Sequence, residues 1–131
     1  MDTCQNILVV DDEEQILFIL SSALSRLGDR CKVMTFSSGQ QALEQARTTP
    51  FDLMLTDLRM PDMDGAALTE AVQAIYPQIV IIWMTAYGCP ATRSQAERLG
   101  VYRCLDKPLE IAEIRQIVRE ALTRAKSKSV R

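Results

Sequence analysis

Acidic side chains, a threonine and a lysine stand where short apolar segments of this chain end. Asp11 and Asp12 follow the first such segment, Asp57 the third, Thr85 the fourth and Lys107 the fifth. Three carboxylates brought together repel one another, by on the order of 4 kcal/mol for a pair at about 4 Å in an effective dielectric near 20. A Mg²⁺ ion offsets this repulsion best, because it binds one or two carboxylates and keeps several waters. With a lysine and a hydroxyl beside it, a carboxylate can act as the nucleophile that accepts a phosphoryl group.

The sequence contains no histidine, which excludes every mechanism that needs an imidazole from the chain itself. Ser-His-Asp and Cys-His catalysis and His-rich zinc sites are therefore ruled out. The cysteines are scattered, form no C-x-x-C pair and follow no signal peptide. We therefore expect reduced thiols in a cytoplasmic protein at Cys4, Cys31, Cys89 and Cys104.

Length and composition indicate one ordinary globular domain. The chain has 131 residues, 47% of them hydrophobic and 24% charged, with a net charge of -2. No apolar run approaches the roughly 20 residues that span a bilayer, so we expect no membrane association. The net charge and the lack of a basic and aromatic surface pattern argue against direct binding of nucleic acid. We expect the domain to cover residues 1–126, with 127–131 as a polar basic tail or the start of a linker.

Apolar segments alternate with helical periodicity along the whole chain. Such alternation predicts an α/β fold with a parallel sheet, because the crossover connections place helices over both faces. The run at 7–10 should be buried on both faces, and the helix at 90–99 should pack weakly because its apolar face is thin. Ligands bind outside the carboxyl ends of such strands, so the side chains above should converge at one edge. The predicted strands are 7–10, 31–36, 51–56, 79–84 and 101–105, and the first helix should stop at Gly28.

Four motifs, each at a predicted strand end, make the chain resemble the receiver domain of bacterial two-component response regulators. They are VVDDE at 9–13, TDLRMPDMDG at 56–65, MTA at 84–86 and KP at 107–108. The resemblance covers nearly the whole chain. It implies a doubly wound (βα)5 sandwich whose five-stranded parallel sheet has the order 2-1-3-4-5.

The resemblance also implies roles for the acidic residues and their neighbours. Asp57 would be the phosphoacceptor and a ligand of Mg²⁺. Asp12 would bind the ion directly and Asp11 mostly through water, while Arg59 would contribute its backbone carbonyl.

For the remaining motifs the resemblance implies a hydroxyl, a cation and a cis peptide bond. Thr85 would bond the phosphoryl oxygens and move inward when they arrive, Lys107 would pair with the phosphate, and Pro108 would follow a cis bond. With no histidine of its own, the chain would receive phosphoryl groups from a sensor histidine kinase or a histidine phosphotransfer protein. It would be no enzyme, apart from catalysing its own Mg²⁺-dependent phosphorylation and dephosphorylation. The cognate kinase, the output domain or effector and a possible homodimer are left open.

One position departs from the family pattern. The family usually has an aromatic residue three positions before the lysine, where this chain has Cys104, and Tyr102 stands two residues earlier. Residues two apart on a strand point to the same face, so Tyr102 could substitute for the missing aromatic residue, or the family's coupling of threonine and aromatic residue could be absent. Whether Tyr102 or Cys104 takes part in switching is left open. We expect phosphorylation of Asp57 to draw in Thr85 and to shift the surface formed by 90–99, 101–105 and the last helix.

Each assignment has an ordinary structural alternative. Asp11 or Asp12 could cap the first helix, and Asp57 and Thr85 could be common strand-end polar residues. Lys107 could be a solvated lysine.

Other functions are also to be weighed. The loop 60–65 could be no more than a turn, and the whole domain could bind a partner without being phosphorylated. A Mg²⁺-dependent phosphatase would have a second acid two residues after its nucleophile, where this chain has Arg59. A flavodoxin would need a phosphate-binding loop rich in hydroxyls and glycine, where this chain has DDEE at 11–14.

Overall fold

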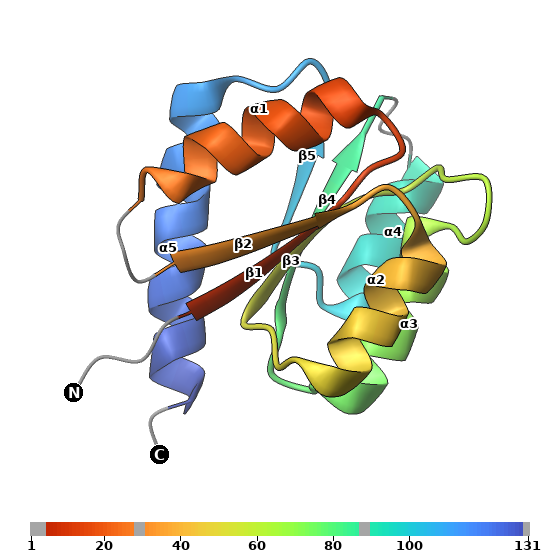
Figure 1. Ribbon diagram of the computed structural model, residues 1–131. Coiled ribbons are helices and arrows are strands. Elements are labelled where there is room, and N and C mark those ends of the chain that lie inside the picture. Colours follow the sequence, from red (N-terminus) through yellow and green to blue (C-terminus); the bar gives the residue numbers. More distant parts are fainter. Residues whose placement is uncertain (1–4, 28–30, 87–89, 130–131) are drawn as a thin grey trace.

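The computed structural model describes residues 5–27, 31–86 and 90–129, and Figure 1 shows strands and helices alternating along them. The predicted stop at Gly28, and the thiols of Cys4 and Cys89, lie outside the described residues. The elements, in chain order, are β1 Gln5–Val10, α1 Glu14–Ser25, β2 Cys31–Phe36, α2 Gly39–Thr48, β3 Leu53–Asp57, α3 Gly65–Ile75, β4 Val80–Thr85, α4 Pro90–Leu99, β5 Arg103–Asp106 and α5 Ile111–Ser129.

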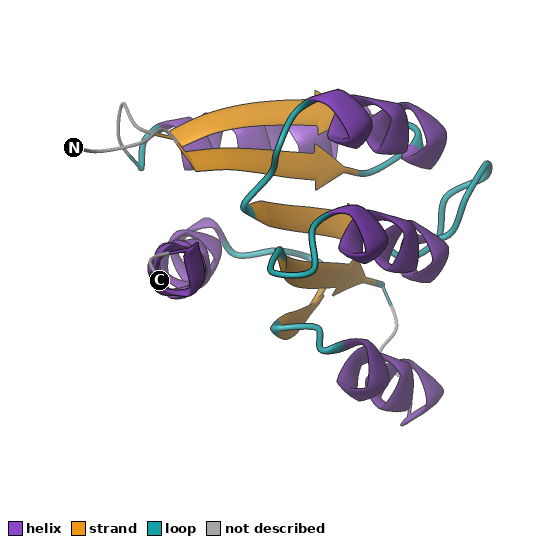
Figure 2. Cartoon of the chain, turned by 90° about the horizontal axis from the view of Figure 1, so that it is seen from below, coloured by secondary structure: helices purple, strands orange, loops and turns teal. Residues whose placement is uncertain are grey.

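The five strands form one parallel sheet in the order β2-β1-β3-β4-β5, which confirms the predicted fold. Helices α1 and α5 pack on one face through one apolar cluster, and α2, α3 and α4 contribute to a second cluster on the other face. Figure 2 shows the C-terminal helix and the group of three helices on opposite sides of the sheet. The chain is therefore a three-layer sandwich whose strands all point to one edge.

The first strand confirms the prediction that 7–10 is buried on both faces. All four residues are fully buried. Side chains alternate along a strand, so Ile7 and Val9 enter the cluster of α1 and α5, while Leu8 and Val10 enter the cluster of α2 to α4. This strand holds the two halves of the core together and fixes where the following acidic turn begins.

Several boundaries differ from those predicted. Strand β3 begins at Leu53 instead of 51, after Asp52 has exchanged hydrogen bonds with Asn6. Strand β5 begins at Arg103 instead of 101. Helix α5 continues to Ser129, through most of the segment expected as a tail.

Weak packing of α4 agrees with its composition. Ala96 is the one fully apolar side chain of this helix that is buried among those the structure describes, with Leu99 partly buried beside it. A helix with so little buried area is less stable than the rest of the fold.

A buried polar pair joins α3 to the centre of the sheet. The indole N–H of Trp83, on β4, donates to the hydroxyl oxygen of Thr69 at 2.9 Å, and both residues are fully buried. The Thr69 hydroxyl in turn donates to the carbonyl of Gly65 one helical turn earlier, at 2.7 Å. The pair therefore satisfies a donor that has no access to water.

We expect Thr69→Val to lower the free energy of unfolding by about 1–3 kcal/mol, because the valine has nearly the same shape but leaves the Trp83 N–H buried without an acceptor. Urea denaturation monitored by circular dichroism measures this loss. Thr123→Val is the matched control, since the exposed Thr123 also donates to the carbonyl four residues back, at 3.0 Å. Equal losses in the two variants would show that the bond to Trp83 contributes nothing.

Candidate functional site

The carboxyl ends of four strands bring the predicted site residues to one edge of the sheet. Asp11 directly follows β1, Asp57 ends β3, Thr85 ends β4 and Lys107 follows β5. One carboxylate oxygen from each of Asp11, Asp12 and Asp57 lies within 4.8 Å of the other two. Asp11 and Asp57 are buried while Asp12 is exposed, so this acidic cluster opens to water on one side.

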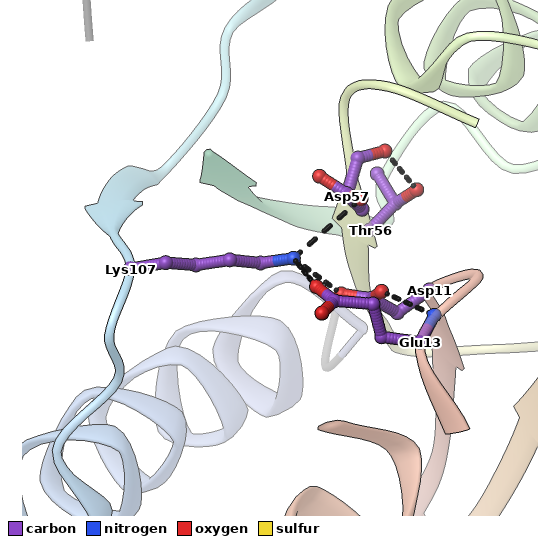
Figure 3. A network of polar contacts seen from close by, with 5 residues as sticks. All are labelled: Asp11, Glu13, Thr56, Asp57 and Lys107. Atoms are coloured by element: carbon purple, nitrogen blue, oxygen red, sulfur yellow. Dashed lines mark hydrogen bonds and ion pairs between the residues drawn. The ribbon is translucent and has the colours of Figure 1, made fainter. Parts of the chain in front are cut away.

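Lys107 reaches into the acidic cluster from β5, as Figure 3 shows. Its ammonium group donates to Asp11 Oδ2 at 2.9 Å and to Glu13 Oε1 at 3.1 Å, and lies 3.5 Å from Asp57 Oδ2. The side chain is only 14% exposed. Lys107 is therefore the cation that the repelling carboxylates require.

The backbone at Lys107 is also fixed. Its N–H donates to the carbonyl of Thr85 at 2.8 Å, and the bond from Lys107 to Pro108 is cis. The ends of β4 and β5 are thus tied together where the hydroxyl and the ammonium group stand.

Burial dominates the electrostatics of Asp11. Its side chain is fully buried, which raises the pKa of the carboxyl above its ordinary value of 3.8. The hydrogen bond from the Glu13 N–H and the nearby ammonium group of Lys107 oppose this shift without cancelling it, and the charge of Asp57 adds to it. Burial alone would lower the pKa of Lys107, but its bonds to Asp11 and Glu13 and the nearby negative charges raise it. The site therefore has an excess of negative charge that one lysine does not fully balance.

Thr85 borders a depression between the loop after β3 and helix α4. The residue is buried, and the depression has a volume of about 380 Å³. Its lining comes from the loop after β3, the start of α3, the end of β4 and helix α4: Leu58, Arg59, Asp64, Ala66, Thr85, Thr92 and Gln95.

The loop after β3 is closed at its base. The N–H of Gly65 donates to the Leu58 carbonyl at 2.9 Å, and a Cβ on Gly65 would overlap the carbonyl oxygen of Asp57. The carboxylate of Asp64 accepts from the Ala67 N–H at 2.7 Å and so caps α3. Residues 60–65 thus form an ordered loop whose contacts at Asp64 and Gly65 hold Asp57 close to the start of α3. Arg59 directly precedes this segment, with an exposed side chain.

Neither Asp11 nor Asp12 is the N-cap of the first helix. That position belongs to Glu13, whose side chain makes no capping bond. Asp11 Oδ1 accepts from the Glu13 N–H at 2.9 Å and so orders the turn before the helix. Sequence reasoning did not single out Glu13 as a partner of Lys107. Its place directly after the acidic pair was the only indication available.

Tyr102 and Cys104 occupy different surroundings. Tyr102 packs against the cluster of α1 and α5, and the guanidinium groups of Arg103 and Arg124 lie 5.7 and 5.4 Å from the centre of its ring. Cys104 is exposed on β5 with a free thiol. In this structure the aromatic ring is held on the α5 side.

The donor set suits a small, hard divalent cation. Carboxylates and backbone carbonyls are the ligands that Mg²⁺ takes in proteins, and an open side leaves room for the waters it retains. One ammonium group stands beside three clustered carboxylates, so a second cation would relieve the remaining negative charge. The acidic cluster is compatible with Mg²⁺.

Comparison with known proteins identifies the family. The family model described as "Response regulator receiver domain" matches residues 7–119. The chain belongs to the response regulator receiver domains. Phosphorylation and the use of Mg²⁺ are general features of this family, and its members are signalling domains.

Sequence relatives of this receiver domain are longer proteins. The transcriptional regulatory protein ZraR of Escherichia coli is 38% identical over 122 residues, which are 93% of this chain and 27% of that protein. The response regulator protein PilR of Pseudomonas aeruginosa is 36% identical over 118 residues, 90% of this chain and 26% of that protein. The receiver domain thus spans about a quarter of the length of the curated relatives it matches.

Solved structures agree with the fold. The signal receiver domain of an HD domain-containing protein from Pseudomonas fluorescens has a TM-score of 0.90 and 29% identity, covering 100% of this chain and 96% of that one. A receiver domain from Methanospirillum hungatei also has a TM-score of 0.90, at 24% identity, covering 97% of this chain and all of that one. None of the helices in the described part of the receiver domain is long and apolar enough to cross a membrane.

We expect Lys107→Met to lower the free energy of unfolding at pH 7 by about 1–3 kcal/mol, because it leaves the buried carboxylates without their cation. The folded state binds the Asp11 proton more tightly than the unfolded chain does, so stability falls as the pH rises above 3.8. Removing Lys107 strengthens this effect, and the deficit of the variant should shrink as the pH is lowered toward 3.8.

Urea denaturation without divalent cations, over a series of pH values, measures the deficit. Lys32→Met, which removes a charge from the exposed side of β2, is the control. A deficit that stays constant or grows on acidification would contradict the account of the acidic cluster.

Proposed function

We propose that this receiver domain accepts a phosphoryl group on Asp57 from a phosphohistidine of a partner protein, and that Mg²⁺ is required. The observation that carries the proposal is the arrangement of Lys107 and the Asp57 carboxylate, 3.5 Å apart, beside two further carboxylates. A buried aspartate without a cation beside it would repel the anionic phosphoryl group that it has to attack. Here a fixed cation stands where phosphoryl oxygens would arrive.

In the proposed step an oxygen of Asp57 attacks phosphorus and forms the O–P bond of an aspartyl phosphate. The P–N bond of the phosphohistidine breaks, and its electron pair stays on the departing imidazole nitrogen. Lys107 then exchanges part of its contact with the carboxylates for an ion pair with the phosphoryl group. The Thr85 hydroxyl donates a hydrogen bond to a phosphoryl oxygen.

Asp11, Asp12, Asp57 and the carbonyl of Arg59 would hold the metal ion. When bound, Mg²⁺ supplies positive charge that neutralises the incoming phosphoryl oxygens and the carboxylates together. The buried Asp11 orients the turn, since it accepts from the Glu13 N–H, and the exposed Asp12 faces the open side of the cluster.

The donor is proposed to be a sensor histidine kinase or a histidine phosphotransfer protein in the cytoplasm. The absence of histidine from the chain supports an external donor. We propose residues 1–126 as the receiver domain, with 127–131 leading toward whatever output domain or effector it serves. Apart from catalysing its own phosphorylation and dephosphorylation, the domain would be no enzyme and would bind neither membrane nor nucleic acid itself.

Incubation with acetyl phosphate and Mg²⁺ is expected to add one phosphoryl group, with acetate as the leaving group. Intact-mass spectrometry measures the addition. Asp57→Asn and a parent sample with excess chelator are the controls, and both should stay unmodified. Absence of the added mass in every sample would favour a binding module that works without phosphorylation.

Phosphorylation is proposed to act on the surface of α4, β5 and α5, beginning with Thr85. The depression beside Thr85 reaches α4, which buries little apolar surface among its described residues and is therefore cheap to move.

We expect phosphorylation to change the hydrogen exchange of the α4 backbone amides more than that of α3, which packs firmly in the core. Exchange followed by mass spectrometry, on matched phosphorylated and unphosphorylated samples, measures the difference. Asp57→Asn treated in the same way should show no change. Identical protection of α4 in both states of the parent would refute the switching surface.

A further inference from the structure

The loop that follows Asp57 is fastened to helix α2 by one carboxylate. Asp62 Oδ2 accepts from the Ser38 hydroxyl at 2.6 Å and from the Gln40 N–H at 3.0 Å, and Oδ1 accepts a longer bond from the Gly39 N–H at 3.4 Å. The Ser38 oxygen also accepts from the Gln41 N–H, so it caps α2 and bonds the loop at once. In Figure 1 the tip of this loop stands beside the beginning of α2. We call this contact the Asp62 bridge.

The chemistry of the bridge favours a charged carboxylate. The first N–H groups of a helix are unsatisfied and carry the positive end of the helix dipole. The Ser38 hydroxyl and then the Gln40 N–H lower the pKa of Asp62 from 3.8 to about 2. Asp62 is therefore ionised at every pH at which the domain would work, and the bridge stays closed.

Apolar contacts beside the bridge hold the same two segments. A Cβ on Gly39 would lie 3.1 Å from Met63 Cβ and 3.3 Å from the Met63 carbonyl oxygen, so a larger residue would push α2 and the loop apart by a few tenths of an ångström. Met60 is buried in the cluster of α2 to α4, and its Cε lies near the same point. The loop is thus held at its base by Gly65 and at its tip by Asp62.

We propose that Asp62 is a positioning residue for the metal site: by fastening the loop to α2 it holds the Arg59 carbonyl in place beside Asp57. This inference rests on the proposed function, which makes that carbonyl a ligand. Arg59 lies between the strand end at Asp57 and the buried Met60, three residues before the bridge. A loop free at its tip would present the same carbonyl over a range of positions, and the free energy of ordering it would be subtracted from metal binding.

The opposite side of the loop supports the assignment. Toward α4 the loop borders the depression of about 380 Å³ and is not packed against the helix there. The only polar fastening of its tip among the described residues is the one to α2. The bridge therefore fastens the part of the loop that follows Arg59, and adds to the hold of the buried Met60.

The test compares Mg²⁺ binding to the unphosphorylated full chain, by isothermal titration calorimetry, in the parent and in Asp62→Ala. We expect the dissociation constant to rise about tenfold, the lower end of the effect of groups that orient metal ligands. The rate of phosphorylation by acetyl phosphate should fall at limiting Mg²⁺ and recover at saturating Mg²⁺. A purely structural role would lower the melting temperature and leave the dissociation constant unchanged.

Two further variants separate positioning from charge. Asp64→Asn removes one charge from the same loop, while an asparagine still caps α3, so it should bind Mg²⁺ nearly as the parent does. Ser38→Ala removes a neutral partner of the bridge from the other element and should weaken Mg²⁺ binding in the same direction as Asp62→Ala. Should Asp62→Ala fail to fold, Asp62→Asn, which keeps one acceptor oxygen, takes its place with a smaller expected loss.

The outcomes distinguish this inference from the proposed function. A parent that binds Mg²⁺ and is phosphorylated, with bridge variants that bind Mg²⁺ equally well, would overturn the positioning role and leave the proposed function standing. An equal loss in Asp64→Asn would also overturn it, because charge alone would then account for the effect. A parent that neither binds Mg²⁺ nor is phosphorylated would overturn both.

Discussion

Repulsion among buried carboxylates is the constraint on which the rest of this structure depends. Asp11 and Asp57 are withdrawn from water at the ends of neighbouring strands, and Asp12 stands beside them on the open side. Burial makes their charges costly, and a single ammonium group, that of Lys107, offsets part of the cost. The site therefore gains stability from further positive charge, such as a divalent metal ion would bring.

The sandwich supplies this constraint by its topology. Parallel strands end at the same edge, so residues from distant parts of the chain meet without a loop having to carry them there. Around Asp57 the support is uneven. On the side of α2 the loop is closed by Asp62 and by the close approach of Gly39, and on the side of α4 it borders a depression. The loop after Asp57 is thus fastened more firmly toward α2 than toward α4.

Much of this could be predicted from the sequence. The alternation of apolar strands and helices predicted the parallel sheet, because it is visible in short-range periodicity. The positions of Asp57, Thr85 and Lys107 at strand ends then predicted that they meet at one edge. Element boundaries were less accurate, since the start of β3 depends on bonds between residues far apart in the chain. The roles of Glu13 and Asp62 were missed for the same reason: an exposed acid is common, and only the folded chain shows which cation or helix end it meets.

Trp83 gives this domain an optical property. It is the chain's single tryptophan, and it is fully buried on β4. In the sheet it is paired in register with Thr56, the residue before Asp57. All indole emission thus originates from one place whose polarity and hydrogen bond are defined, without the averaging that several fluorophores introduce. The unlabelled domain thus carries its own spectroscopic probe in the strand that ends at Thr85, and any event that changes the surroundings of this indole can be followed by its emission with no dye attached.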